Sequence, residues 1–481
     1  MPAVMYNVGD PYAWREEARA IILHGELSVD SEMASTFPSK GAFFVLNPTN
    51  GRWYSRYGSF NGVLLTIPLM AEKLITGELP PLESQTRVIF LGVFYAALSV
   101  VIACVLYLIT GYYTESIPAR FLFVLLAFYT TYLWSYLRNT TQESTHLLLL
   151  ALCYLFFLRF KALPQPLAER SKRDIYLAWA MLFLLCQTKL SYLSLLPFFA
   201  FMTGRVAFKN GLPRDTWHPF ILRMMVIPIA GICIAQAVVH MIKFGNPFLT
   251  GYHQNHDPTF PHTFWSATAD FLWGSQGSIF VHFPLLFLAA FGVWRFIRLY
   301  PDESLFLLGG FLVTYALVAR ATGGWRGELA YGPRYFVVFL PLLSLPALYP
   351  LEWMLGSPHT PPRMAALSVC AVISAFLAAV QMEINRMDYF FKYTVGIQAQ
   401  MINHVMVVSD KAPPVMRDYF ANTNFAKINW DHLRCRRNLE KLPYYTDMAK
   451  HITPENLEKW KQFMEQNIHR SNLYWLPDIN W

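Results

Sequence analysis

Carboxylates gather near the amino terminus of this 481-residue sequence, in the stretch GDPYAWREEAR (residues 9–19). Asp10 lies just ahead of a segment with amphipathic helical patterning, and Glu16 and Glu17 follow within two turns. Carboxylates favour a helix start, where backbone N–H groups lack partners, so a capping cluster is the simplest explanation. A carboxylate placed beside a substrate is equally suited to remove a proton from it. The residues alone leave both explanations open.

Two further ionisable residues lie at the edges of apolar segments. Glu143, in RNTTQES (138–144), heads a long apolar segment, and Lys189, in CQTKLSY, lies in a turn between two short ones. A carboxylate there either caps a helix or belongs to a site when other charged groups face it. Lys189 either extends toward lipid phosphates at the membrane edge or neutralises a buried phosphate.

The densest group of polar and aromatic residues is GGWRGELAYGPRYF (323–336). Arginine forks bind phosphate in a bidentate manner, which suits Arg326 and Arg334. Tyr331 and Tyr335 could flank a sugar or an isoprenoid chain. The alternative is an aromatic belt with interfacial arginines. The number of polar groups in this short stretch favours a site.

Metal and redox chemistry receive little support from the sequence. GYHQNHDPTFPH (251–262) holds three histidines and an aspartate, but their spacing matches no zinc signature, so a loop of capping histidines is the simpler explanation. The six cysteines include no CxxC pair. We therefore predict no metal-ligating residues, and the sequence indicates no cofactor with certainty. A divalent metal is possible, but no specific motif supports one.

The elements that must position these residues belong to a membrane protein. Apolar residues make up 54% of the chain and charged residues 15%, and the mean hydropathy is +0.30, a balance that soluble domains rarely show. The net charge of +8 is spread over short loops between apolar segments. This pattern indicates membrane topology and argues against nucleic-acid binding.

Ten segments are long enough, or nearly so, to span a bilayer. They begin near Arg87, Arg120, Ser144, Ile175, Leu190, Pro219, Ile279, Ser304, Tyr335 and Met364. The fourth and fifth could instead form one broken helix across QTKL, which would invert everything downstream. Basic residues concentrate in alternate loops, namely at Arg159, Lys161, Arg170, Lys172, Arg173, Arg205, Lys209, Arg214, Arg295, Arg298 and Arg363. This bias favours a turn at QTKL and places those loops in the cytoplasm.

The remaining loops then share the outer face of the membrane. We expect three parts: a first extracytoplasmic loop with amphipathic helices (1–86), a transmembrane bundle (87–382) and a small C-terminal extracytoplasmic domain (383–481). Within the first, residues 13–27 and 59–75 have amphipathic patterning. We expect no signal peptide at the amino terminus. Because the polar motifs fall in the outer loops, we predict that they form one site there.

The order of these motifs resembles the polytopic GT-C glycosyltransferases, most of all the bacterial branch related to protein O-mannosyltransferases and the lipid A aminoarabinose transferase. The resemblance covers about residues 6–355 and depends on the order and common sidedness of the motifs. They are GDPYAWREEARAIILHGEL, NGRWYSRYGSFNGVLLTIPL, the acidic start of a Leu-rich span, the TK turn, GSQGSIFVHFPLLFLAAFG and GGWRGELAYGPRYFVVFLPLL. It implies an all-α polytopic membrane protein of GT-C type.

Such enzymes take a sugar from a polyprenyl phosphate at the outer face and generally invert its anomeric carbon. The resemblance implies that Asp10 is the general base and that Glu143 is the acidic position opening a later span. It also implies that Lys189, Arg326 and Arg334 face the lipid phosphate. Tyr331, Tyr335 and Arg56 are expected beside the same donor. The implied partners are the polyprenyl-phosphate donor, the bilayer, and a glycan, lipid or protein acceptor, in the bacterial inner membrane with an extracytoplasmic active site.

Two departures from the family pattern stand out. We expect the transmembrane helix that relatives carry before the first outer loop to be absent here, whether through a misassigned start codon, a partner that supplies the helix or translocation of the N-terminal tail. Pro11 follows Asp10 where many relatives have Asp-Glu, which weakens a carboxylate pair. A transporter or lipid flippase is the main alternative, although repeated halves are not evident. A membrane scaffold without catalysis is a third reading.

Overall fold

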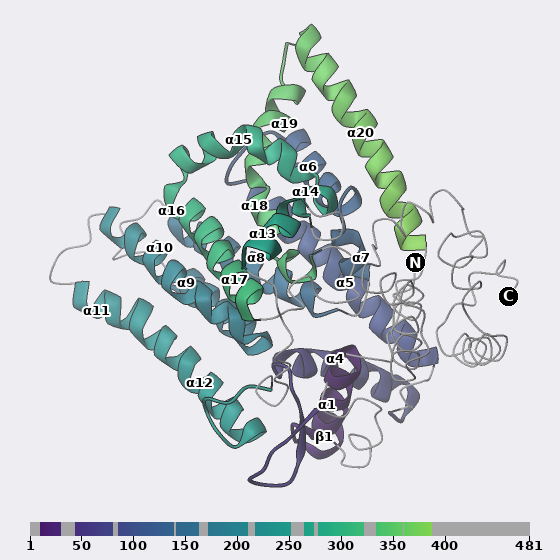
Figure 1. The fold of residues 1–481 in the computed structure, drawn as a ribbon, viewed down its shortest axis with the longest axis vertical. Coiled ribbons are helices and arrows are strands. Elements are labelled where there is room, and N and C mark those ends of the chain that lie inside the picture. Colours follow the sequence, from purple (N-terminus) through teal and green to yellow (C-terminus); the bar gives the residue numbers. More distant parts are fainter. Residues whose placement is uncertain are drawn as a thin grey trace, which may run out of the picture.

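Helices dominate the computed structural model, with a small unit of helices and strands at one end of a helical bundle (Figure 1). The structure describes residues 10–29, 44–79, 85–138, 141–162, 172–209, 217–251, 264–273, 278–321, 333–358 and 360–386. The C-terminal domain expected over 383–481 lies almost wholly outside these residues. So do the histidine-containing stretch 252–262 and most of the loop 323–336.

The N-terminal unit contains two helices and a three-stranded antiparallel sheet. Helix α1 spans Asp10–His24 and packs on α4, which spans Phe60–Thr76. Strands β1 (Ser28–Val29), β3 (Trp53–Ser55) and β2 (Phe44–Leu46) pair in that order, with Tyr54 opposite both Ser28 and Val45. Both helices were expected from their amphipathic patterning, whereas the sheet was not.

The first half of the bundle runs from residue 85 to residue 209. It comprises α5 (Gln85–Thr110), α6 (Ile117–Tyr129), α7 (Leu133–Arg138), α8 (Gln142–Ala162), α9 (Arg173–Thr188), the 3-10 turn η1 (Leu190–Leu195) and α10 (Leu196–Lys209). Helix α8 is the central element, because it packs against both α5 and α9 and buries leucines on several sides. Its strong burial fits a helix that is hydrophobic all round.

The second half is more broken. It comprises α11 (Trp217–Ile221), η3 (Leu222–Val226), α12 (Ile227–Phe244), α13 (Phe264–Trp273), α14 (Ile279–His282), α15 (Leu285–Leu299), α16 (Pro301–Ser304), η4 (Leu305–Gly309), α17 (Gly310–Ala321), η5 (Arg334–Phe336), α18 (Leu340–Leu343), η6 (Leu345–Ala347), α19 (Leu348–Leu355) and α20 (Pro361–Arg386). Helix α20 lies along one edge of the bundle, at the upper right of Figure 1.

Within the described residues, six helical segments are long and apolar enough to cross a membrane, so the chain is an integral membrane protein. They are Phe90–Thr110, Gln142–Ala162, Leu190–Lys209, Trp217–Phe244, Pro301–Ala319 and Pro361–Met382. Each of the ten segments expected from the sequence falls on a helix or a run of helices. Helices α12 and α20 expose most of their apolar residues, as expected of surfaces that face lipid.

Ion pairs mark one end of the bundle. Arg205 Nε lies 3.0 Å from Asp302 Oδ1, Lys209 contacts the same carboxylate, and Lys161 pairs with the neighbouring Glu303. The ends of α8 and α10 therefore lie beside the start of α16. We name the end of the bundle that holds Lys161, Arg205, Lys209, Asp302 and Glu303 the basic end. The 21 residues of α8 span about 30 Å, so its first residues, Gln142 and Glu143, lie at the opposite end of the bundle.

The chain turns back at Lys189, as the sequence predicts. Helix α9 begins at the basic end, where Asp174 lies 3.5 Å from Arg159 of α8. Helix α10 returns there with Lys209. Lys189 itself has extended backbone dihedrals, φ −154° and ψ 127°, which break the helix between the two. A single helix running through QTKL is therefore wrong, and Lys189 lies at the same end of the bundle as Glu143.

Candidate active site

A buried carboxylate and an arginine meet at the end of the bundle opposite the basic end. Glu143 is the second residue of α8 and is 2% exposed. Arg334, the first residue of η5, donates from Nε to Glu143 Oε1 at 2.6 Å. The other carboxylate oxygen, Oε2, is buried and has no hydrogen-bond partner within the described ranges. Glu143 can thus hold Arg334 in place and still accept a further hydrogen bond or a proton.

The backbone before Arg334 is tied to another part of the bundle. Tyr132, between α6 and α7, donates its hydroxyl to the Pro333 carbonyl at 3.1 Å, and its own backbone N–H donates to His282 O at 2.9 Å. Tyr132 is completely buried. Since both ends of this residue are bonded, it fixes the position at which η5 begins and hence the direction of the Arg334 side chain.

Lys189 lies against the ring of Tyr335, the residue that follows Arg334. The Lys189 Nζ is 3.5 Å from the centroid of this ring, a short cation–π distance. His146, one turn into α8, is within electrostatic range of both Lys189 and Arg334 and contacts the Tyr192 hydroxyl through Nδ1 at 3.0 Å. Two cations from distant segments therefore converge near the start of α8.

Arg56 is positioned by unusually close backbone contacts. It follows β3 in the segment Arg56–Ser59, where a Cβ on Gly58 would lie 2.2 Å from the Gln187 carbonyl oxygen and 2.4 Å from that of Thr188. A Cβ on Gly251 would lie 2.3 Å from the Arg56 carbonyl oxygen. Glycine is needed at both places because no side chain fits there. The segment is thus pressed between the end of α9 and the residues after α12.

A buried ion pair also fixes the segment Arg56–Ser59. Lys243 Nζ, on α12, lies 3.0 Å from Glu17 Oε1 and donates to the Tyr57 carbonyl at 2.7 Å and to Ser59 Oγ at 3.2 Å. The two charged side chains are 1% and 0% exposed. Burial raises the pKa of Glu17 above its ordinary value, although the charge and hydrogen bond of Lys243 act to lower it. Glu17 lies in the middle of α1, so helix capping is the wrong explanation for this carboxylate.

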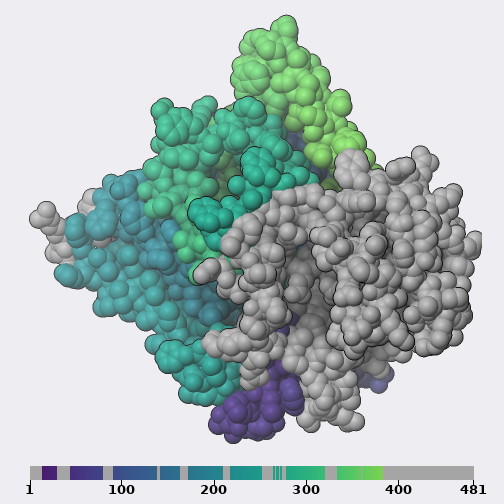
Figure 2. Space-filling model, in the orientation of Figure 1, coloured from purple at the N-terminus to yellow at the C-terminus, as the bar shows by residue number. Residues whose placement is uncertain are grey.

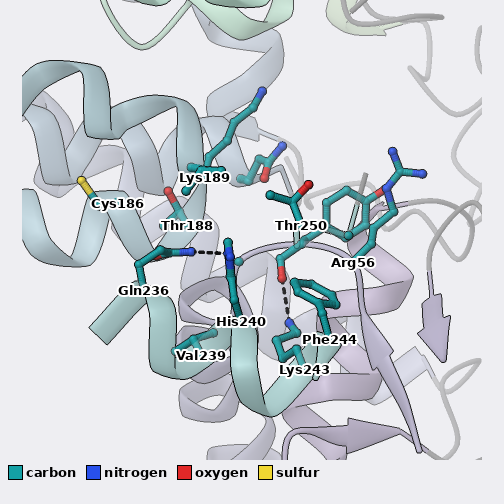
Figure 3. Close-up of a pocket in the computed structure, with 15 residues that line it drawn as sticks. Arg56, Cys186, Thr188, Lys189, Gln236, Val239, His240, Lys243, Phe244 and Thr250 are labelled. Atoms are coloured by element: carbon teal, nitrogen blue, oxygen red, sulfur yellow. Dashed lines mark hydrogen bonds between the residues drawn. The ribbon is translucent and has the colours of Figure 1, made fainter. Parts of the chain in front are cut away.

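These elements enclose a pocket, shown in Figure 3. The end of α9, the buried face of α12, the segment Arg56–Gly58 and residues 250–251 line it. Its polar lining side chains are Arg56, Gln142, Thr188, Lys189, Gln236, His240, Lys243 and Thr250. In Figure 3 the cationic ends of Lys189 and Arg56 both extend toward the same side. Lys189 connects this pocket to Tyr335, on which its ammonium lies, and Tyr335 follows Arg334, the partner of Glu143.

The N-terminal unit lies against the end of α12. The N-terminal unit, in purple, and the end of α12, in teal, lie against each other along one edge of the molecule (Figure 2). The contacts of Lys243 and a hydrogen bond of 2.9 Å from Asn47 Nδ2 to the Ile242 carbonyl join them. Tyr95 of α5 is within electrostatic range of both Arg15 and Glu143, so α1 also lies near the start of α8.

Of the eight residues expected at the site, the structure pairs Glu143 with Arg334 and Lys189 with Tyr335, and it places Arg56 in the same pocket as Lys189. Arg326 and Tyr331 lie outside the described residues, and of Asp10 only the backbone is described, at the start of α1. Within the described ranges, no cluster of three or more His, Cys, Asp or Glu could hold a metal ion.

Sequence reasoning missed the polar face of α12. Gln236, His240 and Lys243 are buried and follow one another at helical spacing, while their apolar neighbours Ile234 and Val238 are 64% and 52% exposed. Polar residues at i, i+4 and i+7 in an otherwise apolar span share one face of a helix. In a membrane helix such a face is directed toward the protein interior and often lines a site. That spacing was the signal that could have found them.

Comparisons with known proteins give one likeness. A search of solved structures finds the apo crystal structure of ArnT from Cupriavidus metallidurans, 13% identical, over 89% of this chain and 72% of that chain, with a TM-score of 0.46. No family model and no curated protein matches. A likeness this distant assigns no role to a residue, so the roles proposed below depend on the geometry of the site.

Proposed function

We propose that this protein is an inverting glycosyltransferase that moves a monosaccharide from a polyprenyl phosphate to an acceptor hydroxyl at the outer face of the bacterial inner membrane. The observation that carries the proposal is the pairing of Arg334 with the buried Glu143 at one end of an apolar bundle, next to Lys189, which lies on Tyr335 and shares a pocket with Arg56. Cations held partly out of water at a membrane edge are suited to a lipid-linked phosphate.

The residue types fit the departure of such a donor. A polyprenyl phosphate leaves as a stable anion, so the reaction needs no acid to protonate the leaving group, unlike glycoside hydrolysis with two carboxylates. Negative charge grows on the phosphate as the bond to the anomeric carbon breaks. Arg334, fixed by Glu143, and Lys189, fixed against Tyr335, would stabilise that charge without rearranging.

The acceptor hydroxyl requires one base. Asp10 is the first residue of α1, and α1 lies near the start of α8. In the proposal Asp10 removes the proton as the hydroxyl attacks from the face opposite the phosphate. Glu143 has a different role, because one of its oxygens already accepts from Arg334; it holds the arginine and offers Oε2 to the substrates.

A transfer assay on the purified full-length protein tests the proposal. The protein in lipid nanodiscs would receive a polyprenyl phosphate carrying a radiolabelled sugar, together with envelope extracts as the source of acceptor. We expect label to move to an acceptor, and Arg334→Ala to reduce the rate roughly 10²-fold or more. Arg52→Ala is the control, since Arg52 is also an arginine paired with a carboxylate, that of Glu26, but it is half exposed and does not line the pocket.

Liposomes distinguish the proposal from a transporter or lipid flippase. A flippase would move the labelled lipid from one leaflet to the other without separating sugar from phosphate. Movement of intact lipid with no transfer to any acceptor would overturn the proposal.

A further inference from the structure

The pocket beside Arg56 has properties that bear on the sugar itself. Its wall on α12 presents Gln236 and His240, each 7% exposed, from a helix whose other side faces lipid. Gln236 Nε2 and His240 Nε2 lie 2.7 Å apart (Figure 3). Burying these polar groups at membrane depth is costly unless they serve a ligand or a contact.

The side-chain oxygen of Gln236 can accept a further hydrogen bond. Its Oε1 is buried and has no partner among the residues that the structure describes. A buried carbonyl oxygen of this kind lowers its free energy when a hydroxyl donates to it. The same pocket is lined by Thr188 and Thr250, which carry hydroxyls, and by Gln142, whose amide can both donate and accept. Such a set of neutral groups matches the several hydroxyls of a sugar ring.

The charged residues of the pocket lining also bear on which ligand the pocket can bind. Arg56, Lys189 and Lys243 line the pocket, and none of its described lining residues is Asp or Glu. Glu17 pairs with Lys243 from outside the lining, and Arg56 and Lys189 are the other two cations of the described lining. A phosphate is attracted to these cations, whereas a positive charge beside the described lining residues would lie next to cations and neutral groups.

We infer that this pocket seats the sugar of the lipid donor, and that the sugar is neutral and rich in hydroxyls, not an amino sugar with a positive charge. The inference rests on the proposed function, because it places the donor phosphate between Arg56 and Lys189. Gln236 is then a specificity residue: its Oε1 accepts from a sugar hydroxyl, and as a neutral group it does not compensate the charge of a buried ammonium group.

Three probes test the inference on the full-length protein in nanodiscs: polyprenyl phosphate without sugar, the same lipid carrying a neutral hexose, and the same lipid carrying a 4-amino sugar. Dissociation constants would be measured for each. We expect the wild type to bind the hexose lipid about tenfold more tightly than the amino-sugar lipid. Gln236→Leu should weaken binding of the hexose lipid roughly tenfold and leave binding of the sugar-free lipid unchanged.

Two variants serve as partners to Gln236→Leu. Gln236→Glu places a carboxylate in the pocket and should shift preference toward the amino-sugar lipid. Ile234→Ala alters the exposed side of the same helix and should change none of the three constants.

The outcomes separate this inference from the proposed function. Failure of the wild type to bind even sugar-free polyprenyl phosphate would remove the proposed function. If the wild type binds that lipid but Gln236→Leu binds hexose and sugar-free lipids as the wild type does, only the sugar pocket is refuted. Preference of the wild type for the amino sugar would refute the neutral-sugar assignment. Unchanged binding of the sugar-free lipid shows that Gln236→Leu is folded.

Discussion

Lys243 and Glu17 form an ion pair with an N–O distance of 3.0 Å and almost no exposure to solvent, although 226 positions separate them in the sequence. The pair joins the end of a membrane helix to the first helix of the N-terminal unit. Its ammonium also bonds Tyr57 O and Ser59 Oγ, which flank the close contact made by Gly58. The ion pair therefore links the position of the Arg56 segment to α12.

Breaking this pair from one side should destabilise the protein strongly. Lys243→Met leaves the Glu17 charge buried without a partner, which typically costs about 3–5 kcal/mol. Replacing both residues, as in Glu17→Leu with Lys243→Met, should recover much of that loss because no isolated charge remains. The apparent Tm in detergent measures both. A double variant as unstable as the sum of the two single variants would show that the pair is not coupled.

The same pair predicts a pH dependence. Burial raises the pKa of Glu17 above its ordinary value of 4.5, so the folded protein holds this proton more tightly than the unfolded chain does. The stabilising contribution of the protonated form is complete below pH 4.5 and is lost as pH rises through the raised pKa. Comparison of wild type with Glu17→Gln between pH 4.5 and pH 8 should show the wild type losing stability relative to the variant. A difference that stays constant over this range would contradict the prediction.

Gly58→Ala should misplace Arg56. The added Cβ would lie 2.2 Å and 2.4 Å from two backbone carbonyl oxygens at the end of α9, and backbone atoms cannot move aside as a flexible side chain can. A displacement of about 1 Å at a binding group can reduce a rate by about 10²-fold, and we expect a loss of this order in sugar transfer. Gly231→Ala on α12 is the matched control, since nothing lies within 4 Å of its added Cβ. Equal activity of the two variants would mean that the close contact does not position Arg56.

The two ends of the bundle should face opposite sides of the membrane. Phe248, close to the pocket residues Thr250 and Gly251, is 87% exposed, and Leu299 at the end of α15 is 55% exposed. In intact spheroplasts we expect a membrane-impermeant maleimide to label Phe248→Cys above the level of the wild type. Leu299→Cys should react only after the membrane is opened. Labelling of both from outside would place the site and the basic end on one side, which the proposed function does not allow.

The sequence predicted at which end of the bundle the candidate site residues lie. Basic residues such as Lys161 and Lys209 mark one end of each span, so Glu143, Lys189 and Arg334 could be assigned to the other end before any coordinates. That assignment brings the segments to one surface, but it does not give the contact between Arg334 and Glu143. Side-chain pairing depends on the packing of η5 against α8, which periodicity does not encode.

The N-terminal unit was harder to predict for physical reasons. Strands of two or three residues are too short to show an alternating pattern, so the sheet around Trp53–Ser55 left no signal. Glu17 was interpreted from its neighbours in the chain, whereas its partner is on α12 and comes from tertiary packing alone. By contrast, the spacing of Gln236, His240 and Lys243 within an apolar span was visible, and it indicates a buried polar face in advance of a structure.

Arg334 and Glu143 should behave as one unit in sugar transfer. Arg334→Ala removes the cation expected to stabilise the departing phosphate, with a loss of about 10²–10³-fold in rate. Glu143→Gln keeps an oxygen that can accept from Arg334 but removes the negative charge that orients it, so we expect a smaller loss. Because the two side chains share a hydrogen bond of 2.6 Å, the double variant should be little worse than Arg334→Ala alone.

Rates from the transfer assay on all three variants complete this double-mutant cycle. Arg205→Ala is its control: it removes an arginine that also bonds a buried carboxylate, Asp302 at 3.0 Å, but at the basic end. That variant should lower the apparent Tm and leave the rate of the remaining folded protein unchanged. Losses for Arg334→Ala and Glu143→Gln that multiply in the double variant would show that the two residues act separately, and Glu143 would then have a role other than holding Arg334.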